Sequence, residues 1–144
     1  MSTELPEDHL VPLLKHALAQ LNARIAKALE PYGIEGREWV VLTTLDGAPP
    51  MSQQEAAAIL RVDRTTMVAL VDGLEAKGLV DRRAHPDDRR KNVVELTDAG
   101  RKTLRSAGRA GEAAEREFLI PLDERGVRQL KTALKSLDSD RSGH

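Results

Sequence analysis

The sequence of 144 residues contains no cysteine and only one tryptophan, one tyrosine and one phenylalanine. Without cysteine the chain can form neither disulfide bonds nor thiolate metal sites, and thiol-based sensing of peroxides is excluded. A reducing, cytoplasmic environment therefore fits best. The shortage of aromatic side chains argues against stacking platforms for single-stranded nucleic acid. The core must instead be built from aliphatic side chains, which suits helices.

Long apolar runs and an excess of one charge are also missing. The longest apolar runs, residues 56–60 and 67–71, are far shorter than the roughly 20 residues that span a bilayer, so we expect no membrane association. The acidic N-terminal residues 1–10 lack the layout of a secretion signal. Because the formal net charge is −1, affinity for nucleic acid must depend on where the cations lie rather than on their sum.

Familiar catalytic and metal-binding motifs are absent as well. The sequence has no glycine-rich phosphate loop, no nucleophile elbow and no HExxH pattern. His9 and His16 could share a helix face, but they would stand about 10 Å apart, which is too far to hold one metal by themselves. We interpret them as surface or interface residues, and we expect no enzyme activity, metal or cofactor.

Helical periodicity dominates what the sequence does contain. Apolar residues recur at spacings of three and four, and residues suited to helix caps stand at the ends of these stretches. Ser52 and Glu55 match a capping box, and Asp63 is a good N-cap. Thr97 can cap a later helix, and Gly78 suits a helix end. The predicted helices cover, in order, residues 10–30, 36–45, 52–60, 63–77, 97–118 and 123–137.

The periodicity changes between the fourth and fifth predicted helices. Residues 79–84 and 92–96 have the pattern of two short strands. Between them, residues 85–91 contain a proline, two aspartates and three cations, which must project into solvent as a hairpin tip. The predicted fold class is therefore mainly α with a small β wing. It is a winged helix-turn-helix core flanked by N- and C-terminal helices.

This order of elements divides one domain, residues 1–144, into a centre and two flanks. The compact centre, residues 36–97, is bracketed by amphipathic helical segments at 10–30 and 98–137. The first helix alone would be about 30 Å long at 1.5 Å per residue. The centre is too small to cover both flanks, whereas a second copy of the chain could cover them. We therefore predict a homodimer formed through the terminal helices.

The two helices joined at Arg61 and Val62 are compatible with a helix-turn-helix. If the apolar residues of the second helix point inward, its outward face consists of Arg64, Thr65, Val68, Ala69 and Asp72, with Thr66 at the border. This face is small enough to approach base edges in a major groove, where arginine can donate to guanine or phosphate and methyl groups can contact thymine. Asp72 would be repelled by phosphate. An ordinary solvated helix face is the alternative interpretation.

The hairpin tip sharpens the interpretation in favour of DNA. It concentrates Arg89, Arg90 and Lys91, and an arginine on a thin hairpin can enter a minor groove. Asp88 could pair with Arg90 and hold its guanidinium outward. The preceding strand adds Arg82 and Arg83 as further basic residues. The alternative is that this charged run is simply a solvated turn.

The run LRVDRTTMVALVDGLEAKGLVDRRAHPDDRRKNVVELTDAGR resembles the MarR family of bacterial regulators. The resemblance implies that the second helix of the motif enters the major groove and that the wing arginine reaches the minor groove. It also implies that Arg90 is the wing arginine, that Asp88 orients it, and that terminal helices build a dimer. Arg61 departs from the family at a turn position often occupied by glycine, and Gly73 departs where a larger polar residue is common.

We therefore expect a sequence-specific regulator of double-stranded DNA, acting as a homodimeric repressor on a pseudo-palindromic operator. Its expected DNA-binding residues are Arg61, Arg64, Thr65, Thr66, Val68, Arg82, Arg89, Arg90 and Lys91. Trp39 is interpreted first as an inter-helix aromatic. By resemblance, it could instead line a pocket for a small aromatic or anionic ligand that releases the DNA. A winged-helix protein-interaction module without DNA binding is the alternative function, and an enzyme with an unfamiliar site is the third.

Overall fold

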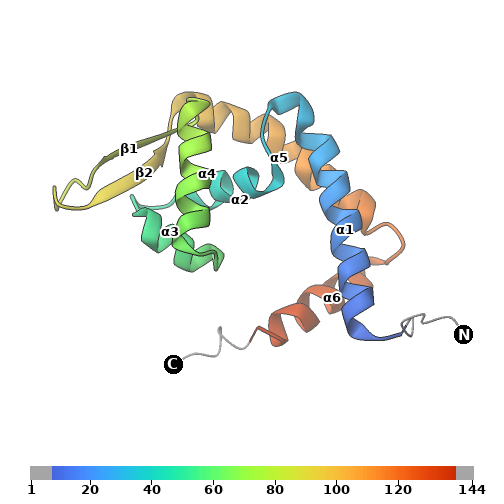
Figure 1. Ribbon diagram of the computed structural model, residues 1–144. Coiled ribbons are helices and arrows are strands. Elements are labelled where there is room, and N and C mark those ends of the chain that lie inside the picture. Colours follow the sequence, from blue (N-terminus) through green and yellow to red (C-terminus); the bar gives the residue numbers. More distant parts are fainter. Residues whose placement is uncertain (1–7, 139–144) are drawn as a thin grey trace, which may run out of the picture.

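The computed structural model describes residues 8–138 and contains a mainly helical chain with one small antiparallel hairpin (Figure 1). The elements are, in order, α1 (Leu10–Leu29), η1 (Glu30–Tyr32), α2 (Gly36–Leu45), α3 (Gln53–Leu60), α4 (Arg64–Ala76), β1 (Val80–Ala84), β2 (Asn92–Leu96), α5 (Asp98–Phe118) and α6 (Glu124–Ser136). The predicted fold class is therefore confirmed. Most of the acidic N-terminal segment analysed above lies outside the described residues. Between residues 8 and 138, no helix combines the length and apolar character needed to cross a membrane.

Side-chain caps set the boundaries of the helices. Each cap oxygen accepts a backbone N–H that the first turn of the helix would otherwise leave unsatisfied. The cap pairs, with oxygen-to-nitrogen distances, are Ser52 with Glu55 at 3.0 Å, Asp63 with Thr66 at 2.6 Å, Thr97 with Gly100 at 2.9 Å and Asp123 with Gly126 at 2.7 Å. These four caps confirm the starts of α3, α4, α5 and α6 that the sequence predicts.

The capping box predicted at Ser52 takes a different form. The Glu55 carboxylate accepts from the Ser52 hydroxyl at 3.3 Å, instead of from the backbone amide that a capping box requires. The complete box lies at α2, where the Glu38 carboxylate accepts from the Glu35 backbone N–H at 2.9 Å. This second box was not predicted from the sequence.

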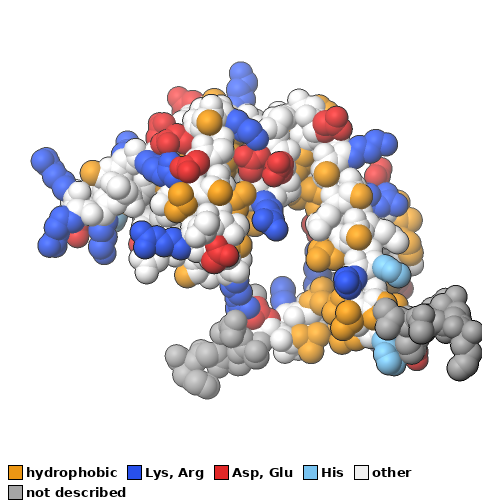
Figure 2. Space-filling model, viewed as in Figure 1, with side chains coloured by type: hydrophobic (Ala, Val, Ile, Leu, Met, Phe, Trp, Pro, Cys, Tyr) orange, Lys and Arg blue, Asp and Glu red, His pale blue; other side chains and the backbone are white. Residues whose placement is uncertain are grey.

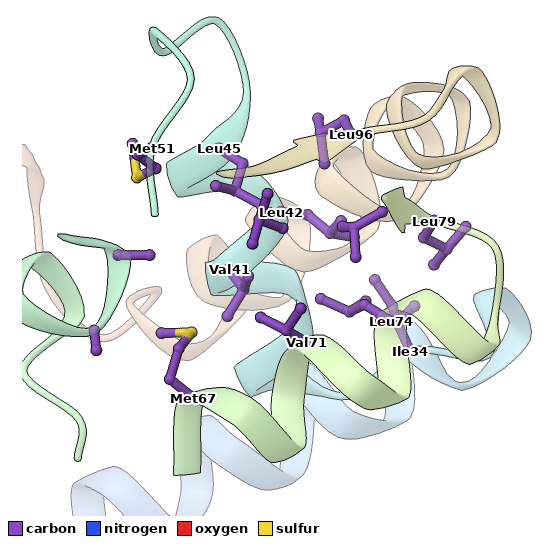
Figure 3. Packing of buried hydrophobic residues seen from close by; sticks show 14 of the residues in the cluster. Ile34, Val41, Leu42, Leu45, Met51, Met67, Val71, Leu74, Leu79 and Leu96 are labelled. Atoms are coloured by element: carbon purple, nitrogen blue, oxygen red, sulfur yellow. The ribbon is translucent and has the colours of Figure 1, made fainter. Parts of the chain in front are cut away.

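The core is aliphatic and lies where α2, α4 and the hairpin meet the ends of α1 and α5 (Figure 3). Met67, Val71 and Leu74 are buried, which confirms the inward face of α4, and Leu70 packs half-buried beside them. The largest fully buried side chains are Leu29, Leu42, Met67, Leu74, Val41, Val71, Val80 and Val93. Burial of these residues is the main favourable term in folding.

The wing is the hairpin of β1 and β2 together with its tip, residues 85–91, and its base is a tight crossing of four segments. The Thr97 hydroxyl donates to the Gly78 carbonyl at 2.7 Å, and the Thr97 amide donates to the Leu79 carbonyl at 3.0 Å. A Cβ at Gly100 would lie 2.0 Å from the Leu79 carbonyl oxygen, so only glycine allows α5 to start there. Gly78, with φ of 75°, turns the chain out of α4. The crossing therefore fixes the wing against both α4 and α5.

Helix α5 leads from the wing base to a second limb, which contains α1 and α6 (Figure 1). The C-terminal end of α1 packs against the core through the buried Leu29, while its N-terminal half leaves large apolar side chains in solvent. No residue of α6 is buried. The exposed apolar residues of this limb are Leu10, Val11, Leu13, Leu14, Leu18, Ile120, Leu122, Leu130, Leu134 and Leu137.

Gly111 lets α5 lie close to α2 at the single tryptophan. A Cβ at Gly111 would lie 2.7 to 2.8 Å from the ring carbons of Trp39, whereas a Cβ at Gly108 would lie 3.8 Å from its indole nitrogen. The indole therefore packs flat against α5, which agrees with the interpretation of Trp39 as an inter-helix aromatic.

This packing gives a test with an internal control. Both Gly108→Ala and Gly111→Ala gain helix propensity, but only the second places a methyl group inside the Trp39 ring contact. Gly111→Ala should be less stable than Gly108→Ala by roughly 1–3 kcal/mol in urea denaturation, which is the usual cost of overpacking. Equal stability of the two variants would contradict the packing.

Candidate nucleic-acid interface

The first two turns of α4 present the residues that the sequence assigns to base contacts. Arg64, Thr65 and Ala69 are exposed, and Thr66 and Val68 are half-buried. The Thr66 amide donates to the Asp63 carboxylate, and this hydrogen bond holds the pKa of Asp63 below its usual range. The cap therefore remains ionised at neutral pH and fixes the end of the helix that carries Arg64.

The wing tip gathers cations at the far end of the hairpin (Figure 2). The turn is closed by the His85 amide, which donates to the Lys91 carbonyl at 2.8 Å, and by the Lys91 amide, which donates to the Asp88 carbonyl at 3.0 Å. Arg89, Arg90 and Lys91 are all exposed. The backbone of the turn is therefore ordered by its own hydrogen bonds, while its charged side chains face solvent.

Asp88 and Arg90 form the pair that the sequence predicts. The Asp88 carboxylate accepts from the Arg90 backbone amide at 3.0 Å and from its Nε at 3.3 Å, and the Arg90 side chain stays 91% exposed. These bonds, chiefly the backbone one, lower the pKa of Asp88. A lowered pKa means that the pair is intact at neutral and weakly acidic pH and is lost only when the pH falls through that lowered value.

Two arginines predicted to bind DNA are engaged within the chain. The Arg82 guanidinium donates to side chains of α3 and α4, and the Arg61 guanidinium forms an ion pair with Asp138, just beyond α6. Arg61 also has a φ of 56°, a conformation that glycine adopts more easily. Arg83, on the outer face of β1, pairs with Glu95 across the hairpin. Phosphate would have to displace these acidic partners.

A buried carboxylate links α2 to the end of α4, and sequence reasoning missed it. Glu38 is 4% exposed, and its Oε1 accepts from the Lys77 ammonium at 2.6 Å. A Cβ at Gly73 would lie 3.4 Å from the other oxygen of Glu38. The unusual glycine at position 73 therefore lies against the Glu38 carboxylate of this ion pair. The signal in the sequence was a glutamate on the inward side of an amphipathic helix.

A groove between α2 and α5 lies beside Trp39. It has a volume of about 360 Å³, and its charged lining consists of three arginines and two acids, Arg101, Arg105, Arg109, Asp46 and Glu112. An indole face next to guanidinium groups suits a flat aromatic anion. Between residues 8 and 138, no three histidine, aspartate or glutamate side chains are grouped closely enough to hold a metal ion.

The helix pair, the wing and their exposed cations define a winged helix-turn-helix DNA-binding protein. A family model described as the MarR family matches residues 32–91. The HTH-type transcriptional regulator YwoH of Bacillus subtilis is 32% identical over 94 residues, which cover 65% of this chain and 69% of YwoH.

Solved structures agree with this match over nearly the whole chain. CouR of Rhodococcus jostii, solved with bound p-coumaroyl-CoA, has a TM-score of 0.83 and 30% identity, over 94% of this chain and 95% of CouR. A mutant of Escherichia coli MarR in complex with operator DNA has a TM-score of 0.83 and 25% identity, over 90% of this chain and 93% of that one. The chain belongs to the MarR family of transcription regulators. Its relatives are regulators, which agrees with the expectation that it is not an enzyme.

The wing geometry predicts how single cations contribute to DNA binding. Arg90→Ala should weaken binding to a specific site by roughly 1–3 kcal/mol, about the value of one good contact. Arg89→Ala or Lys91→Ala should weaken binding evenly across sequences and lower the salt slope by about 1. Fluorescence anisotropy at several salt concentrations measures both effects. Arg116→Ala, which removes an exposed cation near the far end of α5, serves as the control, and an Arg90 variant that matches it would contradict the wing assignment.

Proposed function

We propose that this protein is a homodimeric transcriptional repressor that binds a pseudo-palindromic operator through α4 and the wing. The observation that carries the proposal is the wing tip, where Arg90, held by Asp88, lies between two further exposed cations, Arg89 and Lys91. A partner protein would have no need of three adjacent cations at a hairpin tip, whereas the minor groove attracts them. Occupying an operator would repress transcription, and the protein would act in the cytoplasm, where the DNA is.

Each residue of the proposed interface then has a distinct role. Arg64 donates to guanine or phosphate, and the methyl groups of Thr65 and Val68 contact thymine. The Thr66 hydroxyl, at the border of the face, reaches a phosphate. Arg90 enters the minor groove while its neighbours in the tip, Arg89 and Lys91, contact phosphates. Arg61 joins them only if DNA displaces Asp138 from its guanidinium.

The dimer rests on the exposed apolar side chains of the second limb. Ten large apolar residues of α1, of α6 with its C-cap, and of the turn between α5 and α6 face solvent in one chain. Figure 2 shows apolar side chains gathered over α1 and α6. An apolar patch spread over two helices marks an interaction surface, and a second copy of the same limb would complement it. One domain would then hold a DNA-binding centre at 36–97 and dimer-forming segments at 10–30 and 98–137.

Sedimentation and footprinting test the dimer and its operator together. The intact chain should sediment as a dimer and protect two half-sites about 10 base pairs apart, because two α4 helices must enter one face of the duplex. Leu134→Glu should yield monomers that lose the footprint. Thr132→Glu adds the same charge to the opposite face of α6 and should keep both properties. Protection of a single asymmetric half-site by the intact chain would refute the two-fold geometry.

The groove beside Trp39 is the proposed site for an effector, an aromatic anion that releases the DNA. The arginines of the groove and the indole face support this choice. CouR, a relative at 30% identity, was solved with p-coumaroyl-CoA, in which an aromatic acyl group is joined to an anionic carrier. Such binding would shift the spacing of the two α4 helices without touching either one.

Fluorescence of the single tryptophan gives a direct measurement of effector binding. Titration with p-coumaroyl-CoA or with benzoate should change Trp39 emission and saturate, and Arg105→Gln should raise the concentration needed. Lys102→Gln, on the same helix but not lining the groove, is the matched control. Emission that is unchanged at millimolar concentrations of both probes would exclude aromatic anions of these two kinds.

A further inference from the structure

Arg82 lies on the inner face of the wing, where the strand pattern calls for an apolar residue. Val80 and Arg82 share one face of β1, and Arg82 pairs in register with Val94, which is buried. The Arg82 side chain is only 23% exposed, in contrast to the freely exposed cations of the tip. Its position is therefore that of a core-edge residue and differs from that of a surface cation.

The Arg82 guanidinium joins three elements. Its Nε and Nη2 donate to Gln53 Oε1 at 2.9 and 2.7 Å, at the first residue of α3. Nη2 also donates to Asp72 Oδ1 at 2.6 Å, and Nη1 donates to Glu75 Oε1 at 2.8 Å, both on α4. Arginine has five N–H donors in a fixed fork, and four of them are used here. One N–H remains, too few for a bidentate phosphate contact.

We propose that Arg82 is a positioning residue that sets the angle between the wing and α4, and that it does not contact DNA. The proposal rests on the proposed function, since it concerns how α4 and the wing tip reach adjacent grooves together. Each exposed ion pair alone would contribute little. A shared, partly buried guanidinium that satisfies an amide and two carboxylates is geometrically specific, because only one arrangement of α3, α4 and β1 satisfies all three.

The proposal changes the role of Asp72. If Asp72 were only a charge that phosphate repels, its removal would tighten DNA binding. In the structure the Asp72 carboxylate accepts from the Arg82 guanidinium, so its removal breaks one bond between α4 and the wing and should weaken binding. The two interpretations predict opposite signs for a single substitution, Asp72→Asn, which deletes the charge with almost no change in shape.

The test measures affinity and salt slope on operator and on unrelated DNA, for the full chain and its variants. Arg82→Gln and Arg82→Lys should each lower operator affinity on the order of 10-fold, as loss of a coupled network allows. The salt slope and the affinity for unrelated DNA should stay unchanged. Asp72→Asn should weaken operator binding, and the double variant Asp72→Asn with Arg82→Gln should be no weaker than Arg82→Gln. Arg83→Gln removes the same charge from the outer face of β1 and is the matched control.

Three results would overturn the proposal. The first is tighter operator binding by Asp72→Asn, and the second is an operator affinity of Arg82→Lys equal to that of the unaltered protein. The third is a salt slope lowered by about 0.9 in Arg82→Gln, which is the value of one phosphate contact. Should Arg82→Gln fail to fold, Asp72→Asn and Glu75→Gln change exposed carboxylates and carry the same test. Absence of operator binding by the unaltered protein would refute the proposed function instead. The positioning role of Arg82 is then tested without DNA, by amide hydrogen exchange of the wing. The exchange rate should rise in Arg82→Gln but not in Arg83→Gln.

Discussion

The rest of the structure depends on one close approach, at the base of the wing. Thr97 lies where the end of α4, both strands and the start of α5 meet, and it bonds to the Gly78 and Leu79 carbonyls. Gly100 leaves room there for the Leu79 carbonyl. Because Leu74, Val80 and Leu96 are buried together beside this crossing, α4 cannot turn without moving the hairpin. The two elements proposed to contact DNA, α4 and the wing, are therefore held together at their base. Such rigidity allows a domain with small contact surfaces to select a sequence.

The cations of the chain are concentrated locally, at the wing. Their position, rather than the net charge of −1, allows binding to a polyanion. At the tip, the Asp88 carboxylate accepts hydrogen bonds from Arg90 and orients its side chain. Near the base, the acids of α4 are occupied by Arg82, so they present less free charge to phosphate. The acidic residues of the tip and of α4 thus pair with arginines of the wing.

Local chemistry was readable from the sequence, whereas partnerships across the fold were not. Caps such as Asp63 and Thr97, and the change of period after Gly78, predicted the elements because each depends on residues a few positions apart. The wing pair of Asp88 and Arg90 is local in the same sense. Arg82, however, was predicted to be one more DNA-binding cation. Its partners on α3 and α4 depend on the strand register, which brings together residues far apart in the sequence. Asp138, which pairs with Arg61, lies 77 residues away along the chain, and no local sequence pattern predicts this pairing.

Helix α5 joins the two regions where binding events would occur. Its first turn is locked into the wing base at Gly100, and the face of Gly111 carries the Trp39 indole. These positions are 11 residues apart, or about 16 Å along one continuous helix. A ligand that wedges α2 from α5 beside the indole would have to tilt this helix or distort α2, and both are packed into the core that supports α4. Because the packed core deforms little, the strain would pass to the wing base. A coupling of about 1–3 kcal/mol would suffice to release DNA roughly 5- to 150-fold.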